Sequence, residues 1–276
     1  MLRVYFSLVA CFGSLASAAD NAADIVRRSA LVDQSNDELA KNYTYLEREV
    51  ERKLDSGGAQ KSIESKTWDT TFLYGRPFRR LVEKDGKPLP PDQQKKEQER
   101  FDREVAKRER ESDKDRAHAV AEQEKRRREG RKFLQEIADV YDFRILGEEQ
   151  VSGRDAWVIG AEPKRDYKPT SSDAKNLMKM HGKVWIEKDG YHWVKAEAEV
   201  IDTLSWGLFL ARMSPGTRLE FEQERVNDEV WLPRRMLIRL NARLMFKKFD
   251  AEYESDWSNY RKFTSDSKLT GTGESN

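Results

Sequence analysis

Three histidines, His118, His181 and His192, could serve as imidazole bases or zinc ligands in this sequence. A zinc site or a catalytic triad needs several suitable side chains that converge at one point of the fold. His118 lies in a segment made largely of charged residues, and the other two flank a hairpin that carries Glu187 and Asp189. This spacing favours no site, so we expect neither a metal-binding nor a catalytic histidine.

Other signatures of catalysis are equally weak. Ser205 lies in Leu204-Ser205-Trp206-Gly207, which lacks the glycine that precedes the serine of a nucleophile elbow. Neither of the common glycine-rich phosphate-binding motifs is present. Carboxylates are so frequent that pairs arise by chance, and a solvated surface explains them better. We therefore expect no enzyme and no cofactor, with a hydrolase of unfamiliar site as the enzymatic alternative.

Aromatic residues in the second half of the chain could instead bind an apolar ligand. They fall on segments with the alternating pattern of β-strands. Six of them are candidate ligand-binding residues: Trp157, Trp185, Trp193, Phe221, Trp231 and Tyr253. In a closed sandwich these side chains would fill the core, whereas in an unclosed barrel the same face would line a cavity for apolar ligands. The residues alone leave both alternatives open.

The most apolar stretch after the N-terminal region, residues 204–211, also has two interpretations. It is either a buried strand or a flap that exposes Trp206 and Phe209 to a membrane or to cargo.

The N-terminal residues 1–18 have the layout of a secretory signal peptide. Arg3 precedes an apolar run, and the small residues Ala16-Ser17-Ala18 follow it. The run is too short to span a bilayer. We expect cleavage near residue 18 and an exported chain. The alternative is a lipoprotein anchored to a membrane through Cys11, and since the chain has no other cysteine, we expect no disulfide.

A basic run at residues 125–128 contains Arg126, Arg127 and Arg128. It could be a solvated helix end, a contact for anionic lipid or a protein partner, or a contact for nucleic acid. The whole sequence balances 51 basic against 50 acidic side chains, for a formal net charge of +1. This balance and the export signal both argue against nucleic acid.

The remaining sequence predicts one short helix at residues 21–41 and a long series of strands. The strands are expected at residues 43–54, 63–74, 78–84, 143–147, 157–161, 184–188, 191–201, 217–226, 230–243 and 249–257. The first of these segments could also be a helix, because Leu46, Val50 and Leu54 recur at every fourth position. Asp85-Gly86 and Asp189-Gly190 are hairpin signals. Because apolar and charged residues alternate, we expect an antiparallel sheet with one solvated face, followed by a disordered tail at residues 264–276.

Residues 92–132 differ in composition, with 15 Lys or Arg and 12 Asp or Glu. Acids stand four residues before bases, as in Glu99/Arg103 and Glu122/Arg126, a spacing that stabilises an exposed helix by about 0.2–0.5 kcal/mol per pair. We expect one or two long solvated helices with few contacts to the body. The sparse apolar positions that could make these contacts are Phe101, Val105, Val120 and Ala121, and then Phe133, Leu134 and Ile137.

Several strand and turn motifs resemble the lipoprotein-localisation carrier superfamily (LolA/LolB-like). They are Tyr43-Thr44-Tyr45, residues 154–161, Gly182-Lys183-Val184-Trp185-Ile186, Trp193-Val194-Lys195 and Trp231-Leu232-Pro233-Arg234. Two further stretches, residues 74–77 and 226–233, are similar to an uncharacterised exported bacterial branch of that superfamily. The resemblance covers most of the chain after the leader.

The resemblance implies an α+β fold that is mainly antiparallel β: an unclosed half β-barrel lined by apolar side chains and covered by helices. We expect one such domain at residues 19–263, with a charged helical insertion at 92–137 that is longer than a lid helix of an ordinary carrier. The implied function is a non-enzymatic periplasmic protein that holds a lipid, an acyl chain or a lipoprotein and contacts membranes transiently. The alternative is an envelope interaction or sensor protein that binds a protein partner through the charged helix, with the sheet as a filled core.

Overall fold

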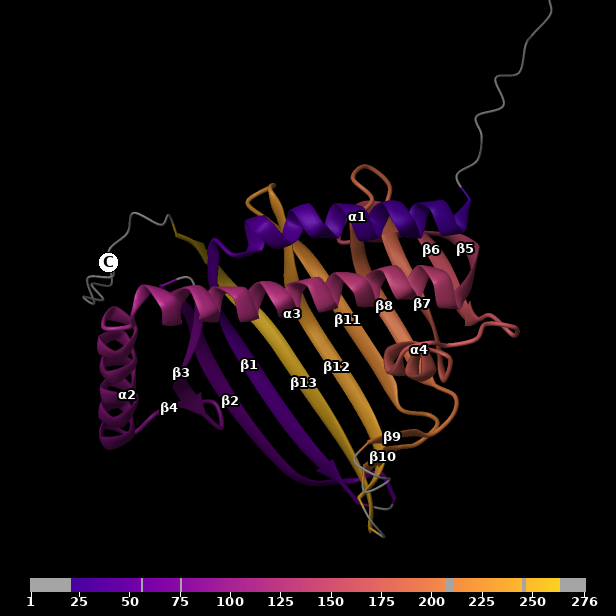
Figure 1. Ribbon diagram of the computed structural model, residues 1–276. Coiled ribbons are helices and arrows are strands. Elements are labelled where there is room, and N and C mark those ends of the chain that lie inside the picture. Colours follow the sequence, from indigo (N-terminus) through magenta and orange to yellow (C-terminus); the bar gives the residue numbers. More distant parts are fainter. Residues whose placement is uncertain (1–20, 56, 75, 207–210, 245–246, 264–276) are drawn as a thin grey trace, which may run out of the picture.

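One long antiparallel sheet forms the body of the protein (Figure 1). The computed structural model describes residues 21–55, 57–74, 76–206, 211–244 and 247–263; the expected leader and C-terminal tail lie outside these ranges. The strands are β1 (Tyr43–Leu54), β2 (Gln60–Leu73), β3 (Arg76–Lys84), β4 (Lys87–Pro88), β5 (Tyr141–Val151), β6 (Arg154–Pro163), β7 (Met180–Glu187), β8 (Trp193–Val200), β9 (Leu204–Trp206), β10 (Ala211–Met213), β11 (Arg218–Val226), β12 (Val230–Leu244) and β13 (Lys247–Lys262).

The strands follow the order β4-β3-β2-β1-β13-β12-β11-β8-β7-β6-β5, with β9 and β10 attached to the side of β12. Every pairing is antiparallel, and β4 and β5 do not pair with each other, so the curved sheet stays open. This confirms the predicted α+β fold with an unclosed half-barrel. The expected hairpin at Asp85-Gly86 is present, and both of its residues have the positive φ that such a turn requires.

Three long helices accompany the sheet: α1 (Ala22–Ala40), α2 (Pro91–Glu109) and α3 (Asp113–Val140). α1 and α3 run side by side across one face of the sheet, and α2 stands beside the edge that β3 and β4 form (Figure 1). Asn21 and Ser112 start α1 and α3 by accepting a backbone N–H of the first turn, which satisfies a donor that the helix leaves free. None of the helices in the described ranges is long and apolar enough to cross a membrane.

A fourth helix, α4 (Ser172–Leu177), lies between β6 and β7, in a segment for which we predicted neither a helix nor a strand. Ser171 caps it, and its buried residues Ala174 and Leu177 pack against Val140 and Tyr141 at the end of α3. The helix is only six residues long, which is too short for a helical period to stand out in the sequence.

The charged insertion is docked more firmly than its few apolar residues suggest. Phe101 of α2 does pack against Phe78 of β3, with ring centroids 5.5 Å apart. The stronger attachment is Arg108, which is buried and donates hydrogen bonds to the carbonyl oxygens of Leu73 at 2.9 Å and Arg76 at 2.8 Å. Our expectation of few contacts through apolar residues therefore misses the main attachment of α2, because a guanidinium can satisfy several carbonyls at a chain reversal.

Alternate residues of each strand point to opposite faces of the sheet. Ile159 and Ile186 pack against Ile25 of α1, and we call this side the helix face. Val158 and Trp185, each one position away along its strand, belong to a separate cluster on the other side, which we call the outer face.

Charged side chains cover the outer face over the middle of the sheet. Glu254 of β13 accepts from Arg52 of β1 at 2.8 Å and from Arg235 of β12 at 2.6 Å. Val50 and Leu237 lie on the same face and are nearly fully buried. The aliphatic parts of long charged side chains can bury such residues without a further layer of structure.

Candidate functional site

Aromatic rings form a line across the helix face. Trp157 lies 5.4 Å from Tyr191, Trp193 lies 5.1 Å from Phe221, and Phe221 lies 6.2 Å from Trp257, measured between ring centroids. The line runs from β6 to β13, so distant parts of the sequence build it. Aromatic contacts at such distances are favourable beyond the area that they bury.

α1 covers one end of this line. Trp157 and Trp193 pack on the cluster that contains Ile25 and Ile159. The indole Nε1 of Trp193 donates to Asp33 of α1 at 3.0 Å. Burial raises the pKa of Asp33, although this hydrogen bond lowers it. This end of the helix face is therefore covered by α1, and Trp157 and Trp193 are partly buried beneath it.

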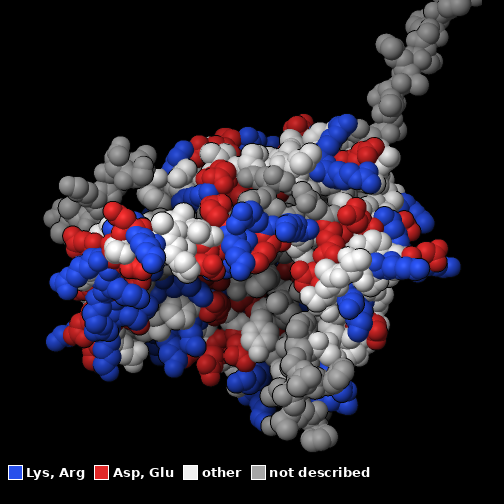
Figure 2. All heavy atoms as spheres, in the orientation of Figure 1, with Lys and Arg blue, Asp and Glu red and all other residues white. Residues whose placement is uncertain are grey.

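The middle of the helix face is only partly covered. Phe221 stands opposite Met236, and Ile238 stands opposite Tyr253, so the four side chains share this face. None of them is fully buried, and neither is Trp257. The molecular surface is hollowed below α3 in this region (Figure 2). A contiguous, partly buried apolar surface in a hollow can bind an apolar ligand.

Acidic residues of β1 line the neighbouring part of the helix face. Glu47 pairs with Trp257 in the sheet register, and Glu49 and Glu51 follow at alternate positions. Arg79 binds both Glu47 at 3.0 Å and Glu49 at 2.7 Å, and Trp68 donates its indole N–H to Glu49 at 2.7 Å. Burial raises the pKa of Glu47, an effect that Arg79 opposes and Glu49 strengthens. The hollow thus has an apolar wall and a carboxylate wall.

The six candidate ligand-binding residues do not all lie together. By register and ring contacts, Trp157, Trp193, Phe221 and Tyr253 share the helix face. Trp185 and Trp231 belong to the buried cluster of Val158 and Val194 on the outer face, so the structure does not bring them together with the other four.

Polar neighbours hold the two outer tryptophans in place. The indole N–H of Trp185 donates to Glu149 at 2.8 Å, and Lys195 lies over its ring. Trp231 is contacted by the ring of His192 and by Arg154. These two tryptophans are structural.

Sequence reasoning did not select several residues that line the hollow, namely Met236, Ile238 and Trp257, nor the carboxylates of β1. The alternation of β12 and β13 contains the first three, but only the strand register shows which rings they meet. For β1, the apolar residues Leu46 and Val50 suggest that their own side is the covered one. In the structure the opposite parity, that of Glu47, faces the helices.

The apolar stretch at residues 204–211 is only partly described. β9 and β10 pair with each other, Leu204 is buried, and β10 continues the sheet on β12. The position of Trp206 is given by its backbone alone, and Phe209 lies outside the described residues. The flap interpretation stays a prediction.

The basic run lies on α3. Arg126 and Arg128 are exposed, and within the described part of the chain they form no ion pair; the side chain of Arg127 is not described. His181 lies 3.3 Å from Glu162, far along the sheet from the surroundings of His192. Among the described residues, no group of three or more His, Cys, Asp or Glu is arranged to hold a metal ion.

Comparison with known proteins gives structural likenesses only. No family model and no curated protein matches the chain. A DUF1329 family protein from Desulfovibrio piger is 14% identical, with a TM-score of 0.35, over 89% of this chain and 95% of that one. A LolA superfamily protein from Nitrosomonas europaea is 9% identical, with a TM-score of 0.31, and the match covers 89% of this chain and 95% of that one. A chain of the Pseudomonas aeruginosa MucA/MucB complex is 11% identical, with a TM-score of 0.25, and the match covers 88% of this chain and 99% of that one.

These likenesses include the superfamily that the sequence motifs resemble. All the identities are below 25% and the TM-scores below 0.5, so what these proteins bind does not transfer to this chain.

Proposed function

We propose that this chain is a non-enzymatic binding protein that holds an acyl chain, of a lipid or of a lipoprotein, against the apolar wall of the hollow on the helix face. The observation that supports the proposal is the group Phe221, Met236, Ile238, Tyr253 and Trp257, which shares one face of the sheet and is only partly buried. A well-filled core would bury these residues.

Apolar burial would supply the affinity. Each buried methylene contributes about 0.8 kcal/mol, so a chain of a dozen carbons could bind without a specific headgroup contact. The proposed compartment is the periplasm, on the basis of the leader-like residues 1–18, with anchoring through Cys11 as the alternative.

The first test is native mass spectrometry of the protein purified from the periplasm, followed by organic extraction. A stoichiometric lipid or acylated peptide is the expected result. A protein that carries no lipid and takes up none from vesicles would contradict the proposal.

A second test uses substitutions in the apolar wall. Phe221→Glu or Ile238→Glu is expected to weaken uptake of a fluorescent fatty acid at least tenfold. The bound acyl chain would remove water from the new carboxylate, which costs free energy. Ile63→Glu is the matched control: Ile63 is an exposed apolar strand residue whose register places it opposite Arg52, on the outer face. Unchanged uptake in a folded Phe221→Glu protein would refute the site.

A second candidate function concerns α3. Exposed Arg126 and Arg128, without ion pairs in the described chain, favour contact with an anionic membrane surface or an acidic partner. Each basic residue near an anionic bilayer contributes about 1 kcal/mol, so Arg126→Gln together with Arg128→Gln should weaken sedimentation with phosphatidylglycerol vesicles by more than tenfold. The control is Arg103→Gln together with Lys107→Gln, which removes two exposed basic side chains from α2 instead and should leave sedimentation unchanged. Deleting the whole insertion would be a poor test, because Arg108 is buried.

A further inference from the structure

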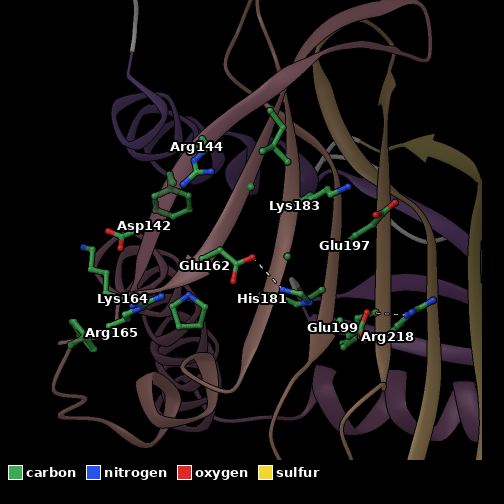
Figure 3. A pocket seen from close by; sticks show the side chains of 18 of the residues that line it. Asp142, Arg144, Glu162, Lys164, Arg165, His181, Lys183, Glu197, Glu199 and Arg218 are labelled. Atoms are coloured by element: carbon green, nitrogen blue, oxygen red, sulfur yellow. Dashed lines mark hydrogen bonds and ion pairs between the residues drawn. The ribbon is translucent and has the colours of Figure 1, made fainter.

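A second hollow lies on the outer face of the sheet. It has a volume of about 1160 Å³ and is bounded by β5, β6, β7, β8 and the start of β11, with residues 163–167 forming one side (Figure 3). Gly160 and Lys183 form part of it, and they alternate with Ile159 and Val184, which pack toward α1. This hollow is therefore separate from the one proposed to hold an acyl chain.

Two cations flank a glycine in this hollow. Arg144 of β5 stands opposite Gly160 of β6, and Gly160 stands opposite Lys183 of β7. Arg144 and Lys183 are thus two strands apart, about 10 Å, on the same row of the sheet. Within the described chain neither forms an ion pair or a side-chain hydrogen bond.

Several of the other charges that line this hollow are ion-paired, including Glu220 with Arg239 at 2.5 Å. Glu199 binds Arg218 at 3.1 Å, and Glu162 lies 3.3 Å from His181, a contact that offsets the Glu162 charge only when the imidazole is protonated (Figure 3). Glu197 binds Lys195 at 2.6 Å, outside the hollow's lining. Asp142 of β5 and Asp166 have no such partner in the described chain, and their charges oppose the binding of an anion, whereas Arg165, also without an ion pair there, favours it.

The glycine between the cations keeps the floor open. A Cβ at Gly160 would come within 3.1 Å of the side chain of Leu146, which leans over this position. Leu146 itself is 52% exposed, so it offers an apolar contact at the edge of the hollow. A larger residue at position 160 would occupy the space between Arg144 and Lys183.

We propose that this hollow binds the phosphate group of an organic phosphate, with Arg144 and Lys183 as its ligands. A phosphate monoester carries nearly two negative charges, which matches two uncompensated cations. An arginine binds phosphate oxygens with paired N–H donors, and a lysine adds a flexible point charge that can swing toward the same group. A volume of about 1160 Å³ exceeds what a phosphate alone needs, so the organic part would lie along Leu146 and the loop at residues 163–167.

The phosphate could belong to a free phosphate ester or to a lipid headgroup, and the test separates these sources. The full chain is titrated with glycerol 3-phosphate in a calorimeter, and in parallel it is sedimented with phosphatidylcholine vesicles with and without phosphatidate. Arg144→Gln and Lys183→Gln should each weaken binding about tenfold, because each removes a charge-assisted hydrogen bond. Asp142→Asn should strengthen binding, because it removes a repulsive charge.

Arg48→Gln is the matched control, since Arg48 is an exposed arginine of β1 on the same face but outside the hollow. Loss of glycerol 3-phosphate binding in Arg144→Gln and Lys183→Gln supports a free ester, and loss of binding to phosphatidate vesicles alone supports a lipid headgroup. The proposal is overturned if neither probe binds, or if the two variants bind as the wild type and Arg48→Gln do.

Discussion

The side chain of Asn36 on α1 pairs with the backbone of Trp231 on β12 in both directions. Its amide donates to the Trp231 carbonyl at 2.7 Å, and its carbonyl oxygen accepts the Trp231 N–H at 2.7 Å. Both bonds are buried, so a helix side chain takes the place of a neighbouring strand at this point.

Asn36→Ala should therefore lower the free energy of unfolding by about 2–4 kcal/mol, because it leaves a buried N–H and a buried C=O without partners. Urea denaturation measures the change. Ser35→Ala is the control, since the exposed Ser35 hydroxyl bonds only within its own helix turn, to Val32. A loss below about 0.5 kcal/mol for Asn36→Ala would show that water replaces the amide.

Arg108→Ala should detach α2 from the sheet. The guanidinium donates to the carbonyls of Leu73 and Arg76 and to the carboxylate of Glu104, and its hydrogen bond lowers the pKa of Glu104. Losing a buried charged donor costs about 2–4 kcal/mol. Amide hydrogen exchange should speed up throughout α2, whereas Arg103→Ala on the exposed side should leave it unchanged. Equal protection in both variants would contradict the docking role.

Asp33→Asn should stabilise the protein at neutral pH. Burial raises the pKa of Asp33, so the folded state binds its proton more tightly than the unfolded state does. Protonation of Asp33 therefore stabilises the folded state. This contribution is fully present below the pKa of Asp33 in the unfolded chain and is lost as the pH rises through its pKa in the folded protein. Asparagine removes the charge and keeps an oxygen that can accept from Trp193. The variant should exceed the wild type in urea stability at pH 7 and approach it near pH 3; a variant that is less stable at pH 7 would refute this account.

Gly182→Ala should separate β7 from β8. A Cβ at this position would lie 2.3 Å from the carbonyl oxygen of Glu197, so the backbone of one strand must move. We expect a loss of at least about 2 kcal/mol. Gly160→Ala is the matched control, because its Cβ meets only the side chain of Leu146, which can shift. Similar thermal midpoints for the two variants would mean that the strands part without strain.

The positions of the strands could be predicted from the sequence because side-chain alternation and turn residues are local signals. The sequence did not predict which face of the sheet each side chain occupies. Trp157 pairs with Ile186, so Trp185 stands one position off and points the other way. A shift of one residue moves every side chain of a strand to the opposite face, and nothing local fixes that register. The split of the candidate aromatics between two faces follows from this.

The buried contacts of charged residues were also not predicted from the sequence. Arg108 is one of fifteen basic residues in a segment that looks uniformly solvated. It is distinguished by its place beside the chain reversal between β2 and β3, where it donates to the carbonyls of Leu73 and Arg76. Composition describes the average environment of a segment, and a single buried member is lost in that average.

The place of β1 in the sheet has a consequence for how the protein is made. Its register pairs Tyr43 with Lys262, so the first strand and the last strand meet near the middle of the sheet. Such a pairing has a very large sequence separation, which slows folding. During synthesis the β1–β3 meander and the strands after α3 can each begin to form, but β1 can pair with β13 only after β13 has been made. Until β1 pairs with β13, the apolar wall on β11 and β12 lacks its neighbour, and exposed apolar surface of this kind is prone to aggregation.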